Sequence, residues 1–346
     1  MHDILDDTDK WMRNGEPVVL ATVVSTWGSS PRQVGAKMAF TPSGKITGSV
    51  SGGCVEGAVY ESGLQTLDTR QGKLLHFGVA DETAFEVGLA CGGSIEVLVR
   101  PLEPATFQVL KTEIEARRPL VLASIIEGAP ELIARETIIN SLGRVTANFG
   151  YGLDEPLRMH AQQAMRGGDP VNLTLETQSG EIIRLFLDVI APPPALVMVG
   201  GVHIAVTLAR IAKALGYTTI VVDPRRSFGS PERFPHVDRL IQAWPQEAFK
   251  EIPLTPNTAV AMLTHDPKID DPALKIVLES PAFYIGALGS QKTQRKRRKR
   301  LLADGLTDAK LNRIHGPIGI DLGAKTPEEI ALSIMAEIIA VRRRNL

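Results

Sequence analysis

The chain has little cysteine, few aromatic residues and almost no net charge. It holds two cysteines in 346 residues, 5% aromatic residues and a formal net charge of -1 at pH 7. Two thiols are too few for a disulfide-stapled fold, and a balanced charge gives no overall attraction for nucleic acid or an anionic membrane. The composition is typical of an ordinary soluble globular protein, and the length predicts two or three domains.

Long apolar runs and the features of a secretory signal are also missing. The most apolar stretch, residues 195–208, is interrupted by Gly200, Gly201 and His203, so it falls short of the about 18 residues of a membrane span. The acidic start, Met1 to Asp7, has neither the basic nor the apolar segment of a signal peptide. We therefore expect a cytoplasmic protein without a membrane span, in which both cysteines stay reduced.

Residues 1–104 predict a mixed α+β domain. The run 17–26 is rich in β-branched residues, and 37–50 is typical of a hairpin around Thr41-Pro42-Ser43-Gly44. A helical pattern of apolar residues follows Cys54. We therefore expect Cys54 at a strand-to-helix junction, where backbone N–H groups are unpaired and carry partial positive charge.

The rest of the chain divides at a proline-rich segment. Residues 105–190 predict an α+β segment without a catalytic signature, which can also belong to the N-terminal domain. Ala191-Pro192-Pro193-Pro194 is typical of a stiff linker. From residue 195 to 346, strand and helix patterns alternate, which predicts a Rossmann-like, doubly wound parallel sheet. The expected fold class is α/β, with this C-terminal sheet and an N-terminal mixed α+β domain.

Each cysteine lies beside a Gly-Gly pair and is followed by a glutamate. The two segments are Ser51-Gly52-Gly53-Cys54-Val55-Glu56 and Ala90-Cys91-Gly92-Gly93-Ser94-Ile95-Glu96. Glycine lets a backbone approach a ligand closely, and a thiol can bind a metal, attack a carbonyl or carry sulfur. The predicted binding residues are Ser51, Gly52, Gly53, Cys54, Cys91, Gly92 and Gly93.

Other interpretations of the cysteines remain open. The absence of a Cys-x-x-Cys spacing makes the case for zinc weak. His76 is the nearest histidine in the sequence that could act as a base for a thiol nucleophile. For both Cys54 and Cys91 the alternative is a small buried thiol in the core.

The first turn of the C-terminal half resembles a degraded dinucleotide fingerprint. Gly200-Gly201-Val202-His203 follows a predicted strand, and Asp223 ends the next one. Val202 stands where the second glycine normally lets the backbone approach a pyrophosphate, so we do not expect ordinary NAD(P) binding. Asp223 would either accept a ribose hydroxyl or cap a turn with Pro224.

Two later strands also end in polar or glycine-rich residues. Thr264-His265-Asp266 and Gly289-Ser290 follow predicted strands, and strand carboxyl ends form the ligand crevice of open parallel sheets. Gly289 and Ser290 open a helix and could cradle a phosphate. The alternatives are a buried or turn-capping His265 and an Asx turn at Asp266. The predicted cofactor-binding residues of this half are Gly200, Gly201, His203, Asp223, His265, Asp266, Gly289 and Ser290.

The run Lys292 to Arg300 is the most concentrated charge in the chain, with seven basic residues in nine. It predicts either a solvated surface helix or a docking patch for an acidic partner or anionic cofactor. No interleaved aromatics accompany the run, so we do not expect nucleic-acid binding. The glycine-rich segment Arg313 to Ala324 predicts either a pocket wall or a tight structural loop.

Taken together, these segments resemble the XdhC/CoxI family of accessory proteins for xanthine dehydrogenase and related molybdenum hydroxylases. In the first part of the chain the resemblance is carried by Ala21 to Val24, Thr26 to Arg32, Gly35 to Met38, Gly48 to Glu56 and Gly88 to Gly93. In the last part it is carried by His203, Val222-Asp223, Thr264-His265-Asp266, Tyr284 to Ser290 and His315 to Gly319. The chain departs from the family pattern at Val202, where the family usually has glycine.

The resemblance implies a chaperone for the molybdenum cofactor (molybdopterin), more than an enzyme. Such a protein would protect the cofactor during sulfuration by a cysteine desulfurase and insert it into an apo xanthine dehydrogenase-family hydroxylase. Cys54 would be the candidate contact to molybdenum. A homodimer is expected from the frequency of symmetric dimers.

Two other functions remain open. One is an NAD(P)-dependent oxidoreductase that uses Asp223 for the ribose and His265 as acid or base. The other is an assembly scaffold that binds no small ligand.

Overall fold

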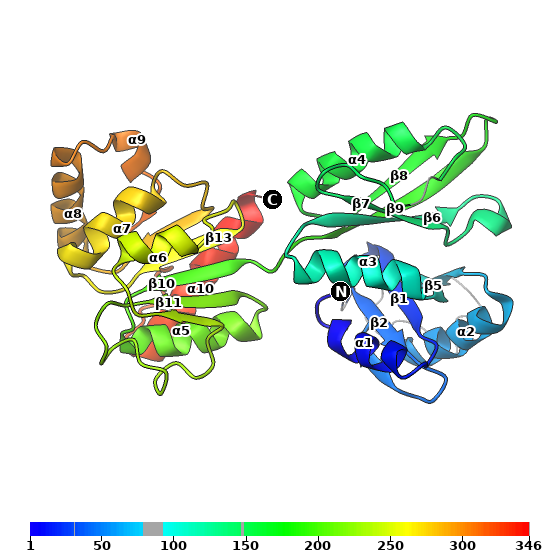
Figure 1. Cartoon of the computed structure of the whole chain (residues 1–346), viewed down its shortest axis with the longest axis horizontal. Coiled ribbons are helices and arrows are strands. Elements are labelled where there is room, and N and C mark those ends of the chain that lie inside the picture. The colour runs from blue at the N-terminus through cyan, green and yellow to red at the C-terminus, as the bar shows by residue number, and fades with distance from the viewer. Residues whose placement is uncertain (31, 79–92, 147–148, 346) are drawn as a thin grey trace. The chain divides into compact units, whose positions relative to one another are not determined.

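The computed structural model describes residues 1–30, 32–78, 93–146 and 149–345 (Figure 1). The chain splits into two compact units, Met1–Pro192 and Pro193–Leu346. Among the described residues, no helix is long and apolar enough to cross a membrane.

The first sheet of the N-terminal unit is antiparallel, with strand order β3-β2-β1-β5-β4. Its strands are β1 (Val19–Trp27), β2 (Lys37–Phe40), β3 (Ile46–Gly48), β4 (Lys73–Phe77) and β5 (Ser94–Pro101). Helix α2 (Glu56–Thr69) covers one face, where Val59 packs against Val19 and Phe40 in the core. The predicted hairpin and the helix after Cys54 are confirmed.

A second antiparallel sheet of this unit has the order β7-β6-β9-β8. Its strands are β6 (Leu120–Glu127), β7 (Glu136–Asn140), β8 (Val171–Glu176) and β9 (Ile182–Ile190), and its helix is α4 (Asp154–Gly167). Helices α1 (Leu5–Arg13) and α3 (Pro104–Glu115) share one core with both sheets, in which Phe107 and Leu110 accompany Leu20 and Leu122. The short 3-10 helix Pro130–Leu132 precedes β7. Helix α1 and strands β7 and β8 were not predicted from the sequence.

The C-terminal unit is a six-stranded parallel sheet with the order β12-β11-β10-β13-β14-β15. Its strands are β10 (Ala195–Val199), β11 (Thr218–Val222), β12 (Arg239–Ile241), β13 (Thr258–Met262), β14 (Tyr284–Ala287) and β15 (Ile314–His315). The strand order reverses between β10 and β13, as in a Rossmann fold. The predicted doubly wound α/β architecture is confirmed.

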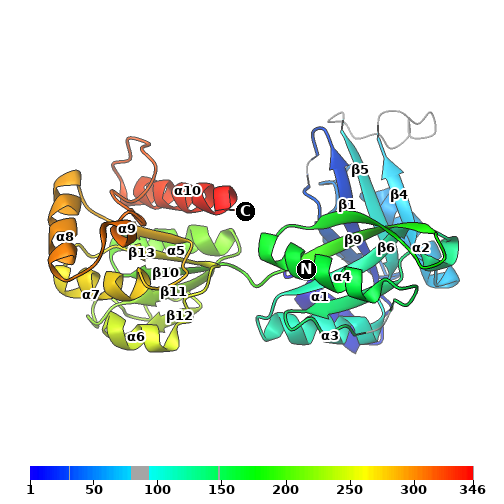
Figure 2. The same ribbon diagram turned by 90° about the horizontal axis from the view of Figure 1, so that it is seen from above.

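Helices cover both faces of this sheet, which is why its central strands read as continuous apolar runs. The helices are α5 (His203–Ala214), α6 (Pro245–Glu251), α7 (Pro267–Val277), α8 (Gln291–Ala303), α9 (Asp308–Leu311) and α10 (Pro327–Asn345). One face packs against α5 and α10, and the other packs against α6, α7 and α8. Figure 2 shows α10 on one side of the sheet and α6 on the other.

Candidate functional site

Cys54 lies in the loop that joins β3 to α2. Its side chain is exposed and its thiol is free. The alternative of a buried core thiol is therefore wrong for Cys54. Gly52 and Gly53 have φ angles of 82° and 121°, which L side chains rarely adopt, so the loop needs glycine at both positions.

The carboxylate of Glu56 organises this loop. It accepts backbone N–H groups of Ser51, Gly52 and Gly53 at 2.9, 3.0 and 2.9 Å, and the Ser49 hydroxyl at 2.7 Å. Burial raises the pKa of Glu56, but the hydrogen bonds from Ser51 and Ser49 outweigh it and lower the pKa to about 2. The loop therefore carries an ionised carboxylate at its centre at neutral pH.

The expectation of unpaired backbone donors around Cys54 is wrong. The N–H groups of Cys54 and Val55 both donate to the Ser51 hydroxyl oxygen at 3.0 Å, while the preceding donors bind Glu56. The anion that such a turn can attract is already present as the side chain of Glu56. The group that this loop offers to a ligand is the Cys54 thiol, a soft donor suited to a soft metal or to sulfur.

The second Gly-Cys segment is only partly described. Cys91 and Gly92 lie outside the described residues. A Cβ atom on Gly93 would lie 2.3 Å from the carbonyl oxygen of Ser29 and 2.8 Å from that of Trp27. Gly93 therefore permits close packing against the segment at the end of β1.

The contact that the structure shows for His76 is with Glu96. Its Nδ1 lies 3.1 Å from Glu96 Oε1, and Glu96 also pairs with Arg184 at 2.9 Å. These contacts give no support to a Cys–His nucleophile pair. Among the described residues, no group of three or more His, Cys, Asp or Glu side chains could hold a metal ion.

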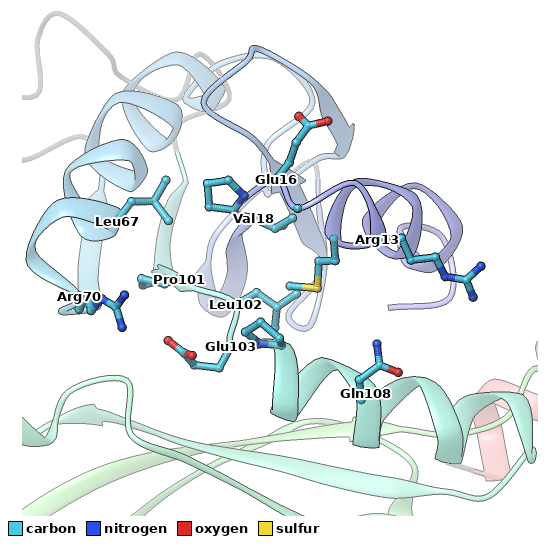
Figure 3. Close-up of a pocket in the computed structure, with 13 residues that line it drawn as sticks. Arg13, Glu16, Val18, Leu67, Arg70, Pro101, Leu102, Glu103 and Gln108 are labelled. Carbon is cyan, nitrogen blue, oxygen red and sulfur yellow. The ribbon is translucent and has the colours of Figure 1, made fainter.

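A cavity of about 490 Å³ in the N-terminal unit is lined by none of the predicted residues (Figure 3). It lies between the end of α1, the junction of β5 with α3 and the end of α2. Arg13 at its edge pairs with Asp9, and Glu16 pairs with Lys45. Two of its charged side chains are thus paired within the unit, and the other two that line it are Arg70 and Glu103.

In the C-terminal unit, the structure gathers predicted residues at the carboxyl edge of the sheet. Because β10, β13 and β14 are neighbouring parallel strands, their ends are adjacent. This edge carries Gly200, Gly201, His203, His265, Asp266, Gly289 and Ser290. It is the crevice in which open α/β sheets bind ligands.

Asp223, at the end of β11, is fully buried, and its carboxylate stabilises the turn that follows this strand. It accepts the Gly201 N–H at 2.7 Å and the Arg225 N–H at 2.9 Å, and its two carboxylate oxygens bind the Arg225 guanidinium at 2.9 and 2.7 Å. Burial raises the pKa of Asp223, but the bonds from Arg225 and Gly201 outweigh it, so the pKa is lowered. A ribose hydroxyl would have to displace these partners.

The glycine turn is likewise used for internal packing. A Cβ atom on Gly201 would lie 2.4 Å from the Phe228 carbonyl oxygen, and one on Gly200 would lie 2.5 Å from the Thr264 side chain. Val202 is the N-cap residue of α5. The missing side chains of the two glycines thus leave room for neighbouring protein segments. That space is not left open for the pyrophosphate of an ordinary dinucleotide fingerprint.

The histidines of this edge are exposed. His265 has a φ of 60°, a left-handed conformation that is uncommon for a residue with a side chain and that clusters at functional sites. The alternative of a buried His265 is therefore wrong. His203 opens α5, and its Nε2 lies 3.7 Å from Glu328.

The other predicted residues of this edge end up at helix starts. Asp266 accepts the Lys268 N–H at 2.9 Å and caps α7, and Ser290 accepts the Thr293 N–H at 3.3 Å and caps α8. Gly289 has a φ of 125°. These interactions are structural caps, and among the predicted residues of this edge they leave the side chains of His265 and His203 exposed.

A buried ion pair below this edge was not predicted from the sequence. Arg297 of α8 donates to Asp270 of α7 at 3.0 Å and to the Leu288 carbonyl at 3.2 Å, and both charged side chains are at most 2% exposed. Burial raises the pKa of Asp270 despite hydrogen bonds from Thr264 and Arg297. The interpretation of residues 292–300 as a solvated helix is therefore wrong for Arg297.

These features define a protein with a Rossmann-type domain and an exposed-cysteine loop in a separate α+β unit. Comparison with known proteins identifies the family. Residues 11–78 match the XdhC and CoxI family, and residues 196–338 match the XdhC Rossmann domain. The chain belongs to the XdhC/CoxI family.

Several known proteins are similar over almost the whole chain. A Bacillus subtilis (strain 168) protein described as a probable subunit of xanthine dehydrogenase is 29% identical over 97% of this chain and 96% of its own length. The Escherichia coli (strain K12) molybdenum cofactor insertion chaperone PaoD is 26% identical over 96% of this chain and 85% of its own length. A crystal structure from Bacillus halodurans, described as a xanthine dehydrogenase, shares the fold with a TM-score of 0.77 and 24% identity, covering 98% of this chain and 96% of that one.

Proposed function

We propose that this protein is a chaperone that binds the molybdenum cofactor and inserts it into a hydroxylase of the xanthine dehydrogenase family. The observation that carries the proposal is the similarity to PaoD along 96% of the chain, combined with an exposed thiol on a loop held by Glu56. A soft thiolate suits a dithiolene-bound molybdenum or its sulfur ligand. In this proposal the cofactor is the cargo of the protein.

The finer steps of the proposal concern sulfur and partners. The cofactor would be sheltered while a cysteine desulfurase supplies its sulfur ligand, and the apo hydroxylase would then receive it. The remaining predicted binding residues, from Ser51 to Gly53 and at the carboxyl edge of the sheet, would shape the loop and the crevice. A homodimer and a cytoplasmic location are part of the same proposal.

The test is anaerobic purification followed by pterin fluorescence and molybdenum analysis. We expect the wild-type protein to retain pterin and Cys54→Ser to lose most of it. Met159→Ser is the matched control, because it removes another sulfur from the same unit at a side chain that is 59% exposed. Equal pterin retention and equal hydroxylase activation by wild type and Cys54→Ser would contradict the role of Cys54.

A further inference from the structure

A small pocket of the C-terminal unit is lined by three arginines. It has a volume of about 220 Å³ and lies between α8 and the segment 311–316. The lining residues are Gln291, Gln294, Arg295, Arg297, Arg298, Leu311, Ile314 and Gly316. No carboxylate is among these lining residues, so the side chains that line the pocket carry a net positive charge.

The spacing of the lining residues explains how one helix forms this wall. Gln291, Gln294, Arg295 and Arg298 are three or four residues apart, so they share one face of α8. Gln294 is fixed because its amide nitrogen donates to the carbonyls of Ala287 and Gly289 at 2.8 and 3.1 Å. These hydrogen bonds tie this face of α8 to the end of β14 and so fix the helix that carries the arginines.

The positive charges of the three arginines are paired with carboxylates to different extents. Arg297 is 2% exposed and pairs with Asp270, yet its Nε atom is buried without a hydrogen-bond partner. Arg298 pairs with Asp308, whose side chain is 69% exposed, and such surface pairs are weak and easily exchanged. Among the described residues, Arg295 has no ion-pair partner. The pocket wall thus combines two arginines that are already paired with carboxylates and one, Arg295, whose charge is free to meet an anion.

We propose that this pocket binds the phosphate group of a small organic phosphate. Guanidinium groups present planar pairs of donors that match phosphate oxygens, and a doubly charged phosphate satisfies more of them than a carboxylate does. The volume is below the about 300–1,000 Å³ of pockets that enclose whole drug-sized ligands, so it suits one anionic group. Leu311 and Ile314 supply an apolar side for the organic part of the ligand.

The proposal is tested by calorimetric titration of the full chain with inorganic phosphate at constant ionic strength. We expect saturable binding in the wild type and an about tenfold loss of affinity in Arg295→Gln, since a charge-assisted hydrogen bond is removed. Lys296→Gln removes one charge from the same helix outside the pocket and should change the affinity less than about twofold. No saturable binding, or equal losses in both variants, would overturn the proposal.

Two further titrations identify the class of molecule that supplies the phosphate. The oxidised phosphopterin derived from the cofactor and AMP are each titrated, with their dephosphorylated forms as controls. Binding that requires the phosphate and Arg295 supports the site, and the tighter of the two ligands shows whether a pterin or a nucleotide supplies the phosphate. If both ligands and their dephosphorylated forms bind equally well, the proposed phosphate site is overturned. Thermal melting of Arg295→Gln and Lys296→Gln should coincide, which separates lost binding from lost folding.

Discussion

The carboxylate of Glu56 accepts both the backbone N–H and the hydroxyl of Ser51. This double contact joins the loop that carries Cys54 to the first turn of α2. The acidic residue two positions after the cysteine is thus a structural part of the loop and fixes the backbone from which the thiol projects.

Replacing Glu56 with glutamine should loosen this loop. Glutamine keeps the shape but loses the charge that strengthens the hydrogen bonds, so we expect the free energy of unfolding to fall by about 1–2 kcal/mol. Amide protons of Ser51, Gly52 and Gly53 should exchange with solvent faster in Glu56→Gln. Glu61→Gln, at an exposed position of the same helix, is the control and should leave exchange unchanged. Unaltered protection in Glu56→Gln would refute the anchoring role.

The contribution of Glu56 should depend on pH in a defined direction. Its pKa is lowered from 4.5 to about 2 in the folded protein, so its stabilisation is fully present above pH 4.5 and is lost as the pH falls toward 2. The stability difference between wild type and Glu56→Gln should be constant from pH 7 to pH 5 and shrink below pH 4.5. Urea denaturation over this range measures it, and a difference that grows on acidification would contradict the assignment.

Asp223→Asn should destabilise the C-terminal unit. The change weakens the bonds to Gly201 and to the Arg225 guanidinium, whose side chain is 35% exposed, so we expect a loss of about 2–3 kcal/mol, below that of a fully buried pair. Glu232→Gln, an exposed site nearby, should change stability by less than about 0.5 kcal/mol. Denaturation is followed by Trp244 fluorescence with Trp11 and Trp27 of the other unit replaced by phenylalanine in all variants. A loss as small as that of the control would argue against a turn-holding Asp223.

The buried pair Arg297 and Asp270 should behave as a coupled unit. Arg297→Met leaves Asp270 buried without its cation and should cost about 3–5 kcal/mol. Adding Asp270→Leu removes the stranded charge, so the double variant should recover part of the stability. A double-mutant cycle by chemical denaturation measures the coupling. Additive losses would show that the two side chains act independently.

Regular segments were predictable where local patterns coincide with burial. The apolar runs Ile182–Ile190 and Ala195–Val199 predict strands and form β9 and β10, because most of their side chains are buried in the sheets. β8 was missed because it alternates exposed and half-buried residues, including Val171 and Asn172. Helix α1 was not predicted because the charged residues between its few apolar positions obscure the helical spacing in the sequence.

The placement of part of the candidate site was predictable from the sequence, whereas the binding role of its residues stays a prediction. The exposed thiol of Cys54 and the gathering of polar strand ends agree with expectation. Three contacts were not predictable, because each depends on a partner that only the folded chain brings close. They are the hydrogen bonds from the loop backbone to Glu56, the pairing of Asp223 with Arg225 and the burial of Arg297 against Asp270.

The sequence by itself determined the α/β class and the parallel sheet, because the period and length of apolar runs encode how strands and helices are buried. It also determined which residues could supply a thiol, since the chain has two cysteines. Only the tertiary structure decided which charged groups face solvent and which are already satisfied. Hydrogen bonding and desolvation depend on neighbours in space, and Arg297 and Asp270 become neighbours only once α8 packs against α7.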